Sequence, residues 1–109
     1  MSNLIDVQGG LTRVGGNEGL YKRLLGKFEA SVDMDGFDAA IADKDYEKAG
    51  EIVHAAKGIA GNLSLSDFFD VSAVLMEQLR GGGTPVDADI ETFKNLFEET
   101  KVAVTEYLG

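Results

Sequence analysis

The sequence predicts an all-α protein, folded as an antiparallel up-and-down four-helix bundle with an additional short N-terminal capping helix. Apolar residues recur at helical spacing in successive segments of the chain. No segment of any length alternates between apolar and polar residues with period two, which would indicate a strand. The connections between these segments are short, which favours antiparallel packing of neighbouring helices. At 109 residues, the chain suits one domain over residues 1–109 with a single modest core.

The N-terminal part of the chain is predicted to hold shorter helices. One is expected between residues 3 and 14, where Gly15-Gly16 would stop it. Asn17 is a good N-cap for a longer amphipathic helix over residues 18–32. The apolar pattern then loosens and resumes as a short helix over residues 37–41.

The central helix is predicted over residues 46–61, with Asp45 as its N-cap. Ser64 is expected to cap the next helix, because an acidic residue follows it at capping-box spacing. That helix carries an apolar stripe as far as residue 79. The two helices together predict a hairpin that closes near residues 63 and 64.

The clearest break in the chain is Gly81-Gly82-Gly83. Thr84 is expected to be the N-cap of the last helix, and Pro85 its first residue, where a missing N–H does no harm. Apolar residues at helical spacing then continue to Leu108, which gives this last helix a buried face.

Composition excludes several classes of function. The chain has 10 basic and 19 acidic residues, a net charge of -9, which disfavours binding to nucleic acid or anionic membrane. No apolar run approaches the roughly 18 residues that insertion across a bilayer needs. Without cysteine there are no disulfides and no thiolate metal sites. The N-terminus lacks the basic start and apolar core of a signal peptide, so we expect a cytoplasmic, monomeric protein or module.

The candidate site is His54, the only histidine in the chain. Gly50, Gly58 and Gly61 are its predicted neighbours on the exposed helix face, with Lys57 one turn further along. Each glycine inside a helix costs roughly 1 kcal/mol relative to alanine, so we expect them to let a large partner dock closely. On a helical projection, His54 points away from the stripe predicted to face the core, which is Ala49, Ile52, Ala56, Ile59 and Leu63.

These residue types suit phosphoryl chemistry. A neutral imidazole nitrogen is a competent nucleophile toward phosphorus, and Lys57 offers a cation for the negative phosphoryl group. In an antiparallel hairpin His54 would lie level with residues 73–78, so Gln78 or Glu77 could orient the ring. The chain has neither a GxxxxGK[ST] loop nor a kinase-like glycine motif, so we expect no autonomous kinase activity.

The sequence also resembles a known family. His54-x-x-Lys57-Gly58, followed by Gly61-Asn62-Leu63, is similar to the signature of histidine-containing phosphotransfer (HPt) domains. Upstream, Gly10-Leu11-x-Arg13-x-Gly15-Gly16 resembles the family's approach to its bundle. In several relatives a glutamine on the following helix orients the imidazole. Met76 occupies that position here, with Gln78 as the nearest substitute.

The resemblance implies a phosphorelay intermediate of two-component signalling. His54 would accept a phosphoryl group from a receiver-domain phosphoaspartate and pass it to another receiver, with support from Lys57 and Gly58. The implied partners are response-regulator receiver domains and a sensor histidine kinase. No cofactor is implied, since any Mg²⁺ would belong to the partner's acidic pocket. The chain would act in the cytoplasm, alone or within a larger membrane-anchored hybrid kinase.

Three alternatives remain open from the sequence. The chain could be the phosphoacceptor domain of a chemotaxis-type histidine kinase, which uses a similar bundle. It could be a non-catalytic acidic helical adaptor in which the histidine is incidental. A small metal-binding bundle is a weaker alternative, because Glu51 would be the only acidic residue one turn from His54 and no second histidine exists.

Overall fold

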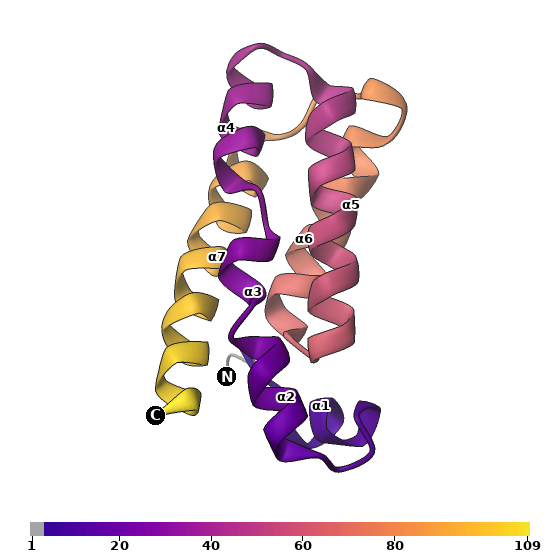
Figure 1. The fold of residues 1–109 in the computed structure, drawn as a ribbon. Helices are drawn as coiled ribbons and strands as arrows, with labels where there is room; N and C mark the ends of the chain where they lie inside the picture. Colours follow the sequence, from indigo (N-terminus) through magenta and orange to yellow (C-terminus); the bar gives the residue numbers. More distant parts are fainter. Residues whose placement is uncertain (1–3) are drawn as a thin grey trace.

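The computed structural model describes residues 4–109, and this part of the chain is helical with no strand (Figure 1). None of the helices in this range is long and apolar enough to cross a membrane. In chain order the elements are α1 (Val7–Arg13), α2 (Glu18–Leu25), α3 (Phe28–Ser31), α4 (Met34–Ala42), α5 (Tyr46–Leu63), α6 (Ser66–Leu79), the 3-10 turn η1 (Arg80–Gly82) and α7 (Asp87–Leu108).

Helices α5 and α6 form an antiparallel hairpin that stands beside α4 and α7 (Figure 1). Helix α4 packs against α5, and the long C-terminal helix α7 packs against α6. Helices α1 and α2 lie together at the end of the molecule where α5 stops and α6 begins (Figure 1). Buried apolar side chains from α2 to α7 form one continuous core.

An aromatic cluster centred on Phe68 of α6 joins the helices of this core. The ring centroid of Phe68 lies 5.7 Å from Phe28 of α3, 5.2 Å from Phe93 of α7 and 5.9 Å from Phe97 of α7. Phe37 of α4 reaches the cluster through Phe93, at 5.0 Å. Offset and edge-to-face aromatic pairs add about 0.5–1.5 kcal/mol each beyond the apolar area that they bury.

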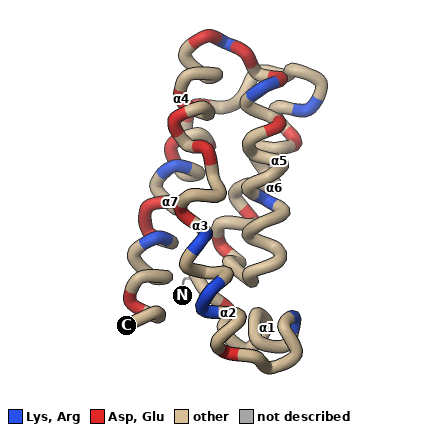
Figure 2. Tube along the Cα trace, in the orientation of Figure 1, with Lys and Arg blue, Asp and Glu red and all other residues tan. Residues whose placement is uncertain are grey.

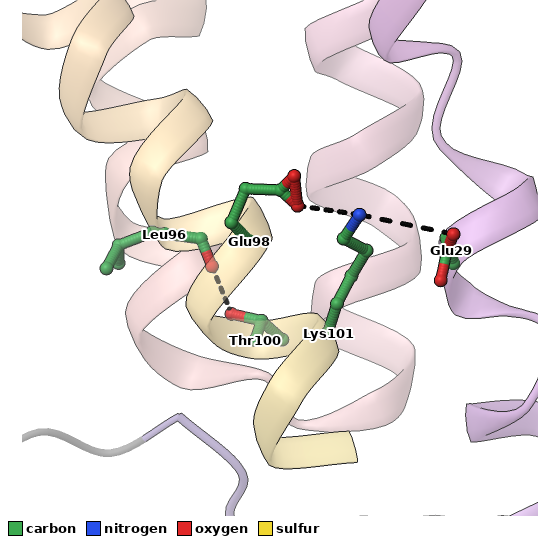
Figure 3. Close-up of polar contacts among 5 residues, drawn as sticks. All are labelled: Glu29, Leu96, Glu98, Thr100 and Lys101. Atoms are coloured by element: carbon green, nitrogen blue, oxygen red, sulfur yellow. Dashed lines mark hydrogen bonds and ion pairs between the residues drawn. The ribbon is translucent and has the colours of Figure 1, made fainter. Parts of the chain in front are cut away.

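Helix α7 contains a buried hydroxyl with a hydrogen-bond partner in the same helix, and a lysine at its surface that reaches α3. The Thr100 hydroxyl donates to the Leu96 carbonyl at 2.6 Å, so a polar atom is accommodated beside the core (Figure 3). The next residue, Lys101, pairs with Glu98 at 2.6 Å and lies 4.0 Å from Glu29 of α3 (Figure 3). Glu29 is largely exposed, so this link between α3 and α7 contributes little to stability.

Helix boundaries in the N-terminal part differ from those expected. The single helix predicted over residues 18–32 is two helices, because the Lys27 N–H bonds the Leu24 carbonyl in a tighter turn, although Gly26 and Lys27 keep right-handed helical angles. The backbone becomes extended at Val32. Helix α4 begins at Met34, three residues before the expected start, because the Asp33 carboxylate accepts the Gly36 N–H at 2.9 Å. The N-cap predicted at Asn17 is confirmed by its bond from the Leu20 N–H at 3.0 Å.

Two further cap predictions are wrong, and one is confirmed. Asp45 caps α5 as expected, accepting the Lys48 N–H at 3.2 Å. Ser64 does not begin α6 but ends α5 in a left-handed conformation with φ of 57°. Thr84 and Pro85 lie in the connection before α7, which begins at Asp87. Helix α7 begins later than expected because the Gln78 side chain of α6 bonds to Val86 and Asp89 at its start.

The N-terminal helices close the end of the molecule through two hydrogen bonds to the C-terminus of α5. The Tyr21 hydroxyl of α2 donates to the Leu63 carbonyl at 2.7 Å, and the Asp6 N–H donates to the Ser64 carbonyl at 2.8 Å. These carbonyls are among those that a helix end leaves without an intrahelical partner. Gly10 of α1 lies against the Tyr21 ring, where a Cβ atom would overlap it.

We expect Tyr21→Phe to lower the free energy of unfolding by about 1–3 kcal/mol, because the buried Leu63 carbonyl would lose its donor. Burial, with the nearby Tyr107 and Asp6, raises the pKa of Tyr21 to about 12. Because the unfolded pKa is lower, stability is complete below about pH 10 and falls as the pH rises toward 12. This fall should be smaller in the variant, as measured by urea unfolding at several pH values.

Tyr46→Phe is the matched control, since the Tyr46 hydroxyl makes no hydrogen bond to any residue in the described range. It should leave the unfolding midpoint nearly unchanged. Equal losses in the two variants would contradict a stabilising role for the bond between Tyr21 and Leu63.

Candidate functional site

His54 lies on the exposed face of α5, as expected. The core-facing stripe of α5 is rotated slightly from the one predicted. Val53 and Ala60 are fully buried, whereas Ile52 and Ile59 are only partly buried at its edge. Helix α5 packs against both α4 and α6, so the centre of its buried face lies between these neighbours rather than under the largest side chains.

A groove of about 360 Å³ runs beside His54, between α5 and the end of α6. Helix α5 forms one side of this groove, and the C-terminal end of α6 with η1 forms the other. Its lining residues are Glu47, Gly50, Glu51, His54, Met76, Leu79, Arg80, Gly81 and Gly82. The sequence had placed His54 level with residues 73–78, and its position in one groove with Met76 agrees with that register.

The three glycines predicted to admit a partner have different surroundings. Gly58 is exposed, and a Cβ atom there would have no neighbour within 4 Å. Gly50 is buried, and a Cβ atom there would lie 3.5 Å from the Leu79 Cβ atom. At Gly61 a Cβ atom would lie 3.3 Å from the ring of Phe69. Gly50 and Gly61 therefore serve the contact between α5 and α6, and only Gly58 is fully open toward solvent.

Lys57 lies on the same side of α5 as Gly61, and its ammonium group is directed toward Phe69 of α6. The Nζ atom lies 5.5 Å from the centroid of the Phe69 ring, in a cation–π contact. Since Phe69 packs beside Gly61, this position is on the side of Lys57 away from His54. Four rotatable bonds let a lysine ammonium move by several ångströms at low cost.

Arg80 is a second cation at the site, and the sequence analysis missed it. It lines the groove with His54, and its guanidinium pairs with Glu77 at 2.6 Å, with both side chains about 70% exposed. An exposed pair of this kind is weak, so Arg80 is available to another anion. The sequence spacing could have indicated this position, because Arg80 follows Met76 by four residues and helical spacing places such residues on one face.

Gln78 does not orient the imidazole, so that prediction is wrong. Its amide Nε2 donates to the Asp89 carboxylate at 2.5 Å, and its Oε1 accepts the Val86 N–H at 2.7 Å. Both polar ends of the side chain are therefore engaged with the start of α7. Met76 is the α6 residue that shares the groove with His54, and a thioether is only a weak acceptor.

No residue of the described chain makes a hydrogen bond or an ion pair with the His54 side chain. No residue in the described range therefore determines which ring nitrogen of the neutral imidazole carries the proton. Within residues 4–109, no group of three or more His, Asp and Glu side chains lies close enough together to hold a metal ion. The site thus presents a nucleophile at the surface beside a shallow groove.

The charges of the protein are arranged unevenly around this site. Acidic residues follow α4 and α7 and the turn that leads into α5 (Figure 2). Residues 52–66, which carry His54, contain no Asp or Glu, and neither do residues 71–76 on the facing helix. Glu47 and Glu51 are the carboxylates that reach the groove. Helix α5 itself therefore carries no carboxylate from His54 to its C-terminal end, where Asp6 and Asp70 of neighbouring segments line a groove with Gly61.

We expect Gly58→Ala to raise the free energy of unfolding by about 1 kcal/mol, since the site is helical and open. Gly61→Ala should gain less, because its Cβ atom would press on Phe69. Urea midpoints of the two variants measure the difference. A loss of stability in Gly58→Ala would contradict the open environment of this glycine.

Comparisons of the chain with protein family models, with curated protein sequences and with solved structures gave no match. The function is therefore argued from the groove, the exposed imidazole of His54 and the charges around them.

Proposed function

We propose that this protein is a phosphotransfer module in which His54 carries a phosphoryl group between aspartates of partner receiver domains. The observation that supports this most is the setting of His54. Its imidazole is exposed, has no hydrogen-bond or ion-pair partner among residues 4–109, and lies on a part of α5 without carboxylates, beside two movable cations. A histidine with a structural role would instead be packed or hydrogen-bonded.

The transfer step balances with residues of the two proteins alone. The unprotonated ring nitrogen of neutral His54 attacks phosphorus, and the bond between phosphorus and the aspartate oxygen of the receiver breaks. The other ring nitrogen keeps its proton, so the product is a phosphoimidazolium and the leaving group is a carboxylate. Return of the phosphoryl group to a second aspartate reverses these changes. Any Mg²⁺ at the step belongs to the acidic pocket of the receiver.

The two cations have matching roles in this proposal. Lys57 swings from the Phe69 ring toward the phosphoryl oxygens, and Arg80 leaves its exposed pair with Glu77 to approach them from the groove. Both interactions that must be given up are weak, so the rearrangement costs little. The phosphoryl group carries concentrated negative charge during transfer, and cations beside it stabilise that charge. Lys57 and Arg80 therefore favour transfer.

The arrangement of the helices fits this role. We propose that α4, α5, α6 and α7 constitute an antiparallel up-and-down four-helix bundle, with the N-terminal helices as its cap. The pairs α4–α5, α5–α6 and α6–α7 all pack together, which supports this topology. Gly58, one turn beyond His54 and without a side chain, then leaves room for loops of the partner.

The proposal is tested by incubating the protein with a phosphorylated receiver and measuring acid-labile label on the chain. Wild type should take up label, and His54→Gln should take up none. The variant should unfold at the same urea concentration as wild type, because His54 contacts no core residue through hydrogen bonds. Label on His54→Gln would show that the phosphorylated residue lies elsewhere.

The same experiment separates the alternative functions. Receiver binding without label in wild type would favour a non-catalytic adaptor. Label obtained only from a kinase core, and never from a receiver, would favour the phosphoacceptor domain of a chemotaxis-type kinase.

Lys57→Ala should slow transfer from the receiver about tenfold, because the phosphoryl group loses one mobile cation in a solvent-exposed site. Rapid-quench measurement of the transfer rate gives this value. Lys48→Ala is the control, since Lys48 is an exposed lysine in the first turns of α5 and does not line the groove. Equal rates for the two variants would remove the role of Lys57.

A further inference from the structure

The connection between α6 and α7 forms a wall of the groove beside His54, yet it makes few contacts of its own. Gly81 and Gly82 line the groove, and both have positive φ, 65° and 81°. Cβ atoms at these two positions would have no neighbour within 4 Å. Side-chain packing therefore does not hold these two glycines, and their position depends on the backbone contact of η1 with α5 and on how the two ends of the connection are fixed.

Gln78 fixes those ends. Its side chain spans the connection, accepting the Val86 N–H at 2.7 Å and donating to Asp89 at 2.5 Å. Val86 is the N-cap residue of α7 and makes no side-chain cap hydrogen bond, and Gln78 accepts its backbone N–H from across the connection, as the N3 side chain of a capping box does. The backbone agrees, because Gly83 packs so closely on the Gln78 carbonyl that a Cβ atom would overlap it.

We propose that Gln78 is a positioning residue for the His54 groove. The two hydrogen bonds of the Gln78 side chain with Val86 and Asp89, here named the Gln78 clamp, hold Arg80, Gly81 and Gly82 in the place where a docking receiver meets them. This inference rests on the proposed phosphotransfer function and adds a determinant of partner recognition to it. The clamp does not touch the imidazole, so it acts on docking and not on the reactivity of His54.

This division of roles has a measurable consequence. If the clamp opens, only the fraction of molecules with a closed wall binds the receiver well, and the apparent affinity falls by that fraction. We expect Gln78→Ala to raise the KM for the phosphorylated receiver about tenfold, with kcat nearly unchanged. Labelling by phosphoramidate, a small donor that releases ammonia on transfer and needs no docking surface, should keep its wild-type rate.

A paired substitution provides the rescue. In Gln78→Glu the new carboxylate would face the Asp89 carboxylate at hydrogen-bond distance, so the clamp should open and the KM should rise. Adding Asp89→Asn restores a donor opposite Glu and leaves the net charge of the chain unchanged. The double variant should therefore return the KM to within about twofold of wild type.

Hydrogen exchange at the Val86 amide tests the clamp without any phosphotransfer. We expect this amide to exchange about tenfold faster in Gln78→Ala and to recover protection in the double variant. Unchanged exchange in Gln78→Ala would overturn the clamp itself. Faster exchange with an unchanged KM, or an equal slowing with the receiver and with phosphoramidate, would overturn its role in docking. Absence of label in wild type would instead overturn the proposed function, and the docking role with it.

Discussion

The close approach of α5 and α6 is the constraint on which the rest of the structure depends. Gly50 and Gly61 let the backbone of α5 lie against Leu79 and Phe69 near the two ends of the hairpin. Between them the buried face of α5 consists largely of small side chains, which have little rotamer freedom to lose. A helix held this closely cannot rotate, so the residue opposite its buried face keeps a fixed position. That residue is His54, and the groove beside it exists because α6 ends one turn beyond Met76.

Charge is the second constraint, and its local arrangement matters more than its sum. A net charge of -9 would repel a dianionic group if all charges acted equally. At physiological salt, charges more than about 8 Å apart across solvent are largely screened, so the nearby residues dominate. Carboxylates are most numerous on α7, whereas α5 itself has none beyond His54. The protein can thus be acidic as a whole and still present a tolerant site for an anion.

Periodicity predicted the helical class, the exposure of His54 and the caps at Asn17 and Asp45, because these depend on residues close in sequence. The errors came where distant residues decide. Gly50 was predicted to be exposed, but Leu79 of α6 covers it. Gln78 was predicted to be near the imidazole, but both polar ends of its amide bond to the start of α7. The break between α2 and α3 has no strong local signal. Arg80 was not predicted because the three glycines that follow it indicate only a break between helices. The local sequence does not indicate that this break lines the groove beside His54.

The way α1 is attached gives the molecule two levels of cooperativity. Helix α1 buries only Gly10 completely, and the partly buried Val7 and Leu11 pack against the core beside the hydrogen bond from the Asp6 N–H to the Ser64 carbonyl. Such a segment opens at a lower free energy than the aromatic centre of the core. Its opening would admit water to the Tyr21 ring while the helices around Phe68 stay packed. The chain has three tyrosines and no tryptophan, so in a variant with Phe at positions 46 and 107 the emission of Tyr21 would report this local event.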